Sequence, residues 1–311
     1  MDTLLSVVIP AYNEALMIEK AARTISGILA EHSINHELIF VDDGSSDETW
    51  QKIQLSSEGI ANLRGIHFSR NFGKEAAIMA GLSAAAGNCC AVIDCDLQHP
   101  PEKIPEMYSL WEQGYEVIEG QKSSRGNEGI FHTVAARTFY SLISAATGFD
   151  MAHASDFKLL DRKAVDVIIN MRERNAFFRA LSSWVGFKTT SVAFNVQERE
   201  AGESTWSTKS LIKYAVNNIT SFSTIPMQLV TALGSLMFIV SLVFGVIALV
   251  QKCMGTALGG FTTVIILQLF IGSIIMISLG IIGYYIARIY EEIKGRPRYI
   301  ISDTCGCSGE K

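Results

Sequence analysis

The sequence predicts an α/β domain with a mostly parallel sheet, followed by a hairpin of two membrane-spanning helices. Two observations lead to this prediction. In the first two thirds of the chain, short apolar runs of strand type alternate with helical patterns. Such alternation implies right-handed crossovers and a parallel sheet. From residue 227 onward the composition changes, and two long segments without a charged residue follow.

The strands and helices of the first part can be placed in order. The run LLSVVIP ends at Pro10 and precedes a helical pattern over residues 15–31. HELIFVD precedes a helix that begins near Asp47, LRGIHF precedes an alanine-rich helix, and CCAVID is the fourth strand. In an open α/β sheet, ligands bind in the crevice at the carboxyl ends of the strands. The polar residues expected at that crevice are Tyr12, Asn13, Glu14, Asp42, Asp43, Asp94 and Asp96.

Two uncharged segments in the last third are long enough to cross a bilayer. They cover residues 227–250 and 261–287, and a spanning helix needs about 20 residues. The alternative is a pair of buried core helices, which such length without charge disfavours. Basic residues precede the first segment and follow the second, and the link between them is short. The positive-inside rule therefore places both ends of a hairpin in the cytoplasm.

The segment just before the first span has a pattern of its own. Apolar residues recur at about helical spacing over residues 206–226, with Lys209 and Lys213 among them. This is typical of an amphipathic helix in the membrane interface, although an ordinary helix of the globular domain is the alternative. The predicted organisation is a cytoplasmic domain over residues 1–205, this interfacial region, the two spans, and a cytoplasmic tail over residues 288–311.

The composition excludes some function classes. The chain has 26 basic and 31 acidic residues and no basic stripe, so nucleic acid is not an expected partner. The six cysteines show no disulfide framework and suit a reducing compartment. No G-x-G-x-x-G follows the first strand, and no P-loop lysine motif occurs. A bound nucleotide would therefore not be held by a glycine-rich turn.

The carboxylates at the predicted crevice indicate a divalent cation. Asp94 and Asp96 follow the fourth strand, and Asp42 and Asp43 follow a neighbouring strand. Magnesium is typically held by one or two carboxylates together with water and substrate phosphates. Both aspartates reach one ion only if the chain bends after Asp94. Helix capping or turn formation by the aspartates is the alternative.

Four motifs in order carry a resemblance to a known family: VVIPAYNE, VDDGSSDET, RNFGKEAAIMAGL and DCDLQHPPE. Together they resemble the family 2 inverting glycosyltransferases, which have the GT-A (Rossmann-like) nucleotide-sugar fold. With the two spans, the chain resembles the polyprenyl-phosphate glycosyltransferases. These include the dolichol-phosphate mannose synthases and, more closely, the bacterial bactoprenol glucosyltransferases. SDFKLLDRKAV, RERNAFFRALSSWVGF and REAGESTWS fit this subgroup too, so the resemblance covers nearly the whole chain.

The resemblance implies a reaction. A sugar would pass, with inversion, from a nucleotide sugar to polyprenyl (undecaprenyl) phosphate at the cytoplasmic face of the inner membrane. UDP-glucose is the first expectation for the donor. The product would be a polyprenyl-monophosphate sugar for modification of cell-envelope glycans.

The resemblance also implies roles for individual residues. The expected catalytic residues are Asp94, Asp96 and Asp156. The expected ligands of Mg²⁺ or Mn²⁺ are Asp94, Asp96 and Gln98. The expected nucleotide-sugar contacts are Pro10, Tyr12, Glu14, Asp43, Lys74 and Gln98. The expected contacts to the acceptor phosphate are Arg172 and Arg174.

Asp156 has three candidate roles. A phosphate oxygen is already anionic at neutral pH, so the acceptor needs no strong base. An orienting role for Asp156 therefore stays open beside a role as base. The third interpretation is an exposed loop carboxylate paired with Lys158 or Arg162.

Other interpretations remain at this stage. GEST places Thr205 where the family often has lysine, so a phosphate contact in that stretch is in doubt. A processive polysaccharide synthase shares the fold but usually has a Q-x-x-R-W motif and more spans. A membrane-anchored sugar-nucleotide binder without catalysis is a further alternative, against which the intact aspartate pair argues. Gly272 and Gly280 are small enough to allow helix packing between copies, so a homo-oligomer is permitted.

Overall fold

The computed structural model describes residues 3–122, 155–171, 178–195, 225–255 and 260–306. The chain divides into two units. The first unit comprises residues 1–208 together with 297–311, and the second comprises residues 209–296. Both ends of the second unit are thus joined to the first.

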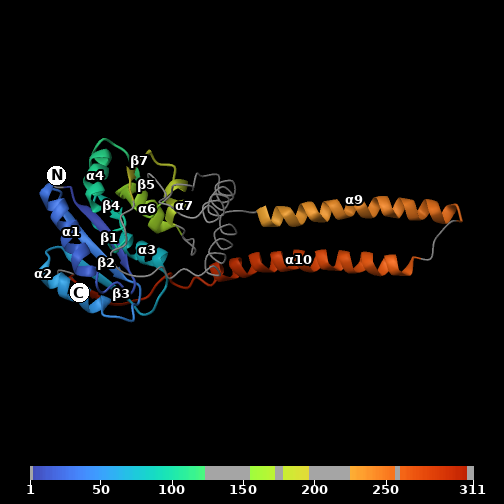
Figure 1. Cartoon of the computed structure of the whole chain (residues 1–311), viewed down its shortest axis with the longest axis horizontal. Helices are drawn as coiled ribbons and strands as arrows, with labels where there is room; N and C mark the ends of the chain where they lie inside the picture. Colours follow the sequence, from blue (N-terminus) through green and yellow to red (C-terminus); the bar gives the residue numbers. More distant parts are fainter. Residues whose placement is uncertain (1–2, 123–154, 172–177, 196–224, 256–259, 307–311) are drawn as a thin grey trace. The chain divides into compact units, whose positions relative to one another are not determined.

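The first unit is built on a mixed sheet with strand order β7-β5-β6-β4-β1-β2-β3-β8 (Figure 1). Its first four strands are parallel neighbours: β1 (Leu5–Ala11), β2 (His36–Asp42), β3 (Leu63–Phe68) and β4 (Cys89–Val92). These strands are near-continuous apolar runs because helices cover both faces of a parallel sheet. The predicted alternation of strands and helices is confirmed.

The helices that follow these strands are α1 (Ile18–Glu31), α2 (Thr49–Gly59), α3 (Lys74–Ala84) and, after a short 3₁₀ turn, α4 (Ile104–Glu112). Helix α1 begins later than predicted because the Met17 N–H donates to the Glu14 carbonyl and closes a turn first. Helix α2 also begins later than predicted, because Asp47 accepts the Thr49 N–H and acts before the helix as a turn residue. The packing of α3 is close, since a Cβ on Gly81 would meet the side chain of Val8 at 2.2 Å.

The sheet continues beyond β4 in mixed directions. β6 (Lys158–Asp161) is antiparallel to both β4 and β5 (Val117–Lys122), and β7 (Thr189–Phe194) is parallel to β5. Helices α6 (Arg162–Asn170) and α7 (Phe178–Trp184) belong to this half. The antiparallel direction of β6 brings its first residues to the carboxyl end of β4, where the site is expected.

The last strand comes from the segment after the membrane helices. β8 (Ile301–Cys305) pairs antiparallel with β3. The Tyr299 ring stacks on Phe68 with centroids 5.1 Å apart, and the Ser69 N–H donates to the Ile300 carbonyl at 3.0 Å. This segment was expected only as a cytoplasmic tail. Four of the five β8 residues are exposed, so this edge strand lacks the apolar pattern that would have predicted it.

The second unit contains two long helices, α9 (Ile225–Cys253) and α10 (Phe261–Ile293), which lie side by side (Figure 1). In the described part of the chain, both are long and apolar enough to cross a membrane, with mean hydropathies of 2.4 and 2.0 over their best windows. Many of their described large apolar side chains are exposed, which is typical of a surface that contacts a membrane or a partner protein. Of the predicted interfacial region over residues 206–226, residues 206–224 lie outside the described residues, and the last two residues belong to α9.

Candidate active site

Asp94 and Asp156 face each other because of the register between β4 and β6. Val92 pairs with Lys158 in this antiparallel ladder, and two further residues along the same register bring Asp94 opposite Asp156. Hydrogen bonds between Gly120 and Phe157 and between Ser155 and Gly120 keep the segment before β6 alongside β5. The two carboxylates therefore meet at the carboxyl end of β4, the predicted crevice.

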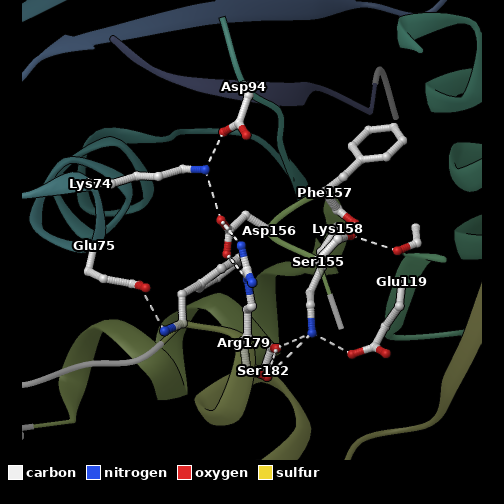
Figure 2. Close-up of polar contacts among 12 residues, drawn as sticks. Lys74, Glu75, Asp94, Glu119, Ser155, Asp156, Phe157, Lys158, Arg179 and Ser182 are labelled. Carbon is white, nitrogen blue, oxygen red and sulfur yellow. Dashed lines mark hydrogen bonds and ion pairs between the residues drawn. The ribbon is translucent and has the colours of Figure 1, made fainter. Parts of the chain in front are cut away.

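Lys74 lies between these two carboxylates (Figure 2). Its Nζ is 2.6 Å from Oδ1 of Asp94 and 2.8 Å from Oδ2 of Asp156. Lys74 is the first residue of α3, where the backbone N–H groups and the helix dipole also favour anions. Its side chain is 42% exposed. The structure thus places Lys74 at the start of a helix, as the sequence indicated.

Asp156 also binds Arg179 of α7. Nε of Arg179 is 2.7 Å from Oδ1 and Nη2 is 2.8 Å from Oδ2, so the guanidinium contacts both carboxylate oxygens. Although burial alone would raise the pKa of Asp156, the charges of Lys74 and Arg179 hold it well below its usual range. Asp156 is therefore ionised and a weak base.

The interpretation of Asp156 as an exposed loop carboxylate is wrong. Asp156 is 4% exposed, in a bend just before β6, where Lys74 and Arg179 pair with it. Its two proposed partners are engaged elsewhere: Lys158 pairs with Glu119, and Arg162 donates to the carbonyls of Ala85 and Gly87.

Arg179 belongs to this charged site but was not among the residues predicted from the sequence. The stretch RERNAFFRALSSW has three arginines, and the two chosen for the acceptor phosphate, Arg172 and Arg174, lie outside the described residues. The helical spacing of Phe178, Leu181 and Ser182 was a signal for an inward helix face, and all three residues are buried. Arg179 borders that face. Its partner, however, lies 23 positions earlier in the sequence, so no local pattern names it.

Glu75 joins the start of α3 to the start of α7. Its Oε2 accepts the Phe178 N–H at 2.9 Å. Burial, and then the negative charge of Asp156, raise the pKa of Glu75 to about 7. The site therefore holds three carboxylates, of Glu75, Asp94 and Asp156, close to two cations.

The aspartates after β4 are followed by the expected bend. Residues 95–96 form a turn, Leu97 has a φ of 56°, and the Gln98 N–H donates to Oδ1 of Asp96 at 3.1 Å. His99 is buried, with its ring stacked on Phe157 at 5.4 Å. The chain thus turns sharply between Asp94 and Gln98.

The expected nucleoside side lies at the carboxyl ends of β1 and β2. Pro10 is buried within β1, and Tyr12 is 48% exposed just beyond it. Glu14 is held by a hydrogen bond from its N–H to Oγ1 of Thr49. Asp43 accepts the N–H groups of Phe72 and Gly73 at 2.7 and 2.9 Å. Asp43 thus fixes the loop that leads into Lys74, and its predicted bond to a base stays a prediction.

Comparison with known proteins identifies the family. The model of "Glycosyl transferase family 2" matches residues 6–169, more than half of the chain. The chain belongs to the family 2 glycosyltransferases. The predicted resemblance, the GT-A type of fold and the assignment as an enzyme are confirmed. The matched residues contain Lys74, Asp94, Asp96 and Asp156 but not Arg179.

Full-length relatives support the membership. "Uncharacterized glycosyltransferase YkcC" of Bacillus subtilis is 39% identical over 308 residues, covering 98% of this chain and 95% of the relative. "Prophage bactoprenol glucosyl transferase homolog" of Escherichia coli is 35% identical, covering 96% of this chain and 98% of the relative. "Bactoprenol glucosyl transferase" of Shigella phage SfII is 34% identical, covering 96% and 97%.

The site of this glycosyltransferase suits a divalent cation. Two carboxylates and one amide oxygen, from Asp94, Asp96 and Gln98, are the hard oxygen ligands that Mg²⁺ and Mn²⁺ prefer. Asp94 already attracts a cation, the ammonium of Lys74. Within the described residues, no group of three or more His, Cys, Asp or Glu side chains is arranged to hold a metal ion. Water and substrate phosphates would therefore complete the coordination.

The buried carboxyl group of Asp43 predicts a pH dependence of stability. Burial raises its pKa to about 6 from the ordinary 3.8, although two backbone N–H groups oppose the shift. The stability that this group adds is therefore present below the ordinary pKa and lost as the pH rises through 6.

Thermal unfolding of the full chain in detergent checks this sign. The unfolding midpoints of the natural chain and of Asp43→Asn are compared at about pH 4.5 and about pH 7.5. The midpoint of the natural chain minus that of the variant should be several degrees larger at the lower pH. Asp47→Asn is the matched control. Hydrogen bonds from Thr49 outweigh the burial of Asp47 and lower its pKa, so its removal should give no such gain in acid. A difference for Asp43→Asn that is constant or grows with pH would contradict the prediction.

Proposed function

We propose that this glycosyltransferase transfers one sugar from a nucleotide sugar, with UDP-glucose as the first candidate, to polyprenyl phosphate. One observation carries the proposal: Lys74 and Arg179 flank an ionised Asp156 beside Asp94, in a chain that also has two apolar helices of spanning length. Two cations at one point suit a reaction in which a phosphate is the nucleophile and a diphosphate is the leaving group. The names of two relatives, which refer to bactoprenol and to glucosyl transfer, support the same acceptor and sugar.

The proposed reaction is a displacement at the anomeric carbon of the donor. The bond from this carbon to the diphosphate oxygen breaks, and a bond to an oxygen of the lipid phosphate forms on the opposite face. A divalent ion held by Asp94, Asp96 and Gln98 would neutralise charge on the leaving diphosphate. Lys74 and the N-terminus of α3 face the same group from the protein side.

Asp156 acts in this proposal as an orienting group. The acceptor oxygen is anionic before it reacts, so no proton has to be removed. The charges of Lys74 and Arg179 hold the pKa of Asp156 well below its usual range against the effect of burial, which makes it a poor base. Its geometry suits another task, since its two oxygens hold Lys74 and Arg179 in fixed directions.

The membrane arrangement also belongs to the proposal. Both ends of the second unit join the first, which supports a hairpin whose two ends lie on one side of the bilayer. Basic residues next to both spans support the cytoplasmic side. The catalytic domain would then act at the cytoplasmic face of the inner membrane, where the phosphate of a polyprenyl carrier is within reach.

A transfer assay tests the proposed function. Membranes that contain the full chain are incubated with labelled nucleotide sugars, polyprenyl phosphate and Mg²⁺ or Mn²⁺. We expect a lipid carrying one sugar, formed fastest from UDP-glucose among UDP-glucose, UDP-N-acetyl sugars, a modified arabinose donor and GDP-mannose. A long polymer would instead indicate a processive synthase. No lipid product with any donor would refute the proposal.

A further inference from the structure

Beside the site lies a lysine that does not face the reacting groups. Lys158 begins β6, two residues after Asp156, and its side chain is fully buried. A buried ammonium group costs several kcal/mol unless its charge and its hydrogen bonds are satisfied. Its partners therefore show what the residue does.

The ammonium of Lys158 joins two elements. It forms an ion pair with Glu119 of β5. It also donates to Oγ of Ser182 at 2.6 Å and to the carbonyl oxygen of Arg179 at 3.5 Å, both in α7. Burial lowers the pKa of Lys158, and the carboxylate of Glu119 opposes that shift. The three donors of the ammonium thus connect β6, β5 and the first turn of α7.

The spacing on strand and helix explains why these contacts reach the site. Asp156 stands two residues before Lys158, and its charge is close enough to raise the pKa of the Lys158 ammonium against the effect of burial. Arg179 and Ser182 are three residues apart in α7, so they share a face. Arg179 meets Asp156 while Ser182 meets Lys158 (Figure 2). The N–H of Phe178, bound by Glu75 of α3, holds the same turn of α7 from another side.

We propose that Lys158 is a positioning residue: it fixes the first turn of α7 against β6 and so directs Arg179 at Asp156. The inference rests on the proposed function only for the identity of the reaction. An apolar pair of similar volume would pack at least as well as a buried ion pair. What the ammonium adds is direction, because it fixes the peptide of Arg179 as well as the helix face.

Loss of this anchor should affect turnover more than donor binding. The expected donor contacts come from Asp43, which directly follows β2, and from Lys74 at the start of α3, and Asp43 accepts the N–H groups of Phe72 and Gly73. A small displacement of Arg179 and Asp156 instead changes the alignment of the reacting groups. Misplacement by about 1 Å can reduce a rate roughly 100-fold.

The test uses the full chain with the pair Lys158→Met and Glu119→Gln, which removes both charges together. We expect kcat to fall at least about tenfold while the KM for the nucleotide sugar changes less than about threefold. Adding Arg179→Ala to this pair should lower kcat no further than Arg179→Ala alone, because both changes remove the same alignment. Full turnover in the folded pair variant, or losses that multiply, would overturn the proposal.

A matched pair of charges provides the control. Arg64 and Glu37 form a partly buried ion pair between β3 and β2, without contact to α7. Arg64→Met with Glu37→Gln should reduce thermal stability without selectively lowering kcat. If this control variant shows the same selective loss of kcat, the effect is general destabilisation and Lys158 is not a positioning residue.

Hydrogen exchange gives a readout that does not depend on the reaction. In the Lys158→Met, Glu119→Gln chain, the amides of residues 178–184 should lose protection while those of β4 and β1 keep theirs. This result distinguishes failure of the inference from failure of the proposed function, since it holds whatever product the enzyme makes. If the pair variant does not fold, Ser182→Ala is the milder change, because it removes one hydroxyl that accepts from Lys158 and donates to the Arg179 carbonyl. It should lower kcat about threefold, and unchanged kcat and unchanged exchange would overturn the proposal.

Discussion

A chain with Asp96 replaced by alanine should lose roughly 10²–10³-fold in sugar transfer. Asp96 stands in the turn after β4, where its Oδ1 also accepts the Gln98 N–H at 3.1 Å. Its removal takes away a proposed metal ligand and the hydrogen bond that shapes the turn. The charge on the leaving diphosphate would then lack its main compensation.

Two measurements check this expectation. The rate of lipid-sugar formation is compared with that of Asp166→Ala, which changes an exposed carboxylate on α6 and should leave the rate within about twofold. Calorimetric titration with UDP should show that Mn²⁺ tightens binding to the natural chain and to the control but not to Asp96→Ala. Asp96 is excluded as a metal ligand if the Asp96→Ala chain keeps more than a tenth of the natural transfer rate and Mn²⁺ still tightens its binding of UDP.

A chain that ends at Arg296 should lose both stability and activity. It lacks β8 and Tyr299, so β3 becomes an open edge and Phe68 loses its stacking partner. The loop after β3 also loses the hydrogen bond between Ser69 and Ile300. Removing several strand hydrogen bonds and one ring contact should cost about 3–5 kcal/mol, or roughly 10 °C in the unfolding midpoint.

The loss of activity has a structural path of its own. The loop over residues 69–73 carries the N–H groups that Asp43 accepts, and it leads directly into Lys74. We therefore expect sugar transfer to fall at least about tenfold even well below the unfolding midpoint. A chain that ends at Gly306 keeps β8 and is the control. Equal midpoints and rates for the chains ending at Arg296 and Gly306 would show that β8 is dispensable.

The sequence was most informative where burial is complete on both faces of the sheet. β1, β2 and β4 are apolar runs that end in polar residues, so their order, direction and crevice could be predicted. Asp94 could be placed at the crevice for the same reason, and Lys74 at the start of its helix. These properties depend on neighbours in the sequence and on the general geometry of parallel sheets.

The contacts that define the charged site could not be predicted this way. Asp156 meets Asp94 through the antiparallel register of two strands far apart in the sequence, and a shift of one residue would turn every side chain to the other face. Arg179 and Lys158 depend in turn on how α7 packs on β6. β8 was missed because an exposed edge strand need not be apolar.

The position of β8 has a consequence for how the enzyme is made. A ribosome delivers the chain from its N-terminus, so β1 to β4 emerge well before the two apolar helices, and residues 301–305 emerge last. The edge of β3 therefore stays unpaired by β8 until both long helices have been synthesised. A nascent chain whose hairpin fails to insert would keep that edge exposed to chaperones and proteases. In the proposed membrane arrangement, completion of the sheet would thus couple maturation of the catalytic domain to membrane insertion of the hairpin.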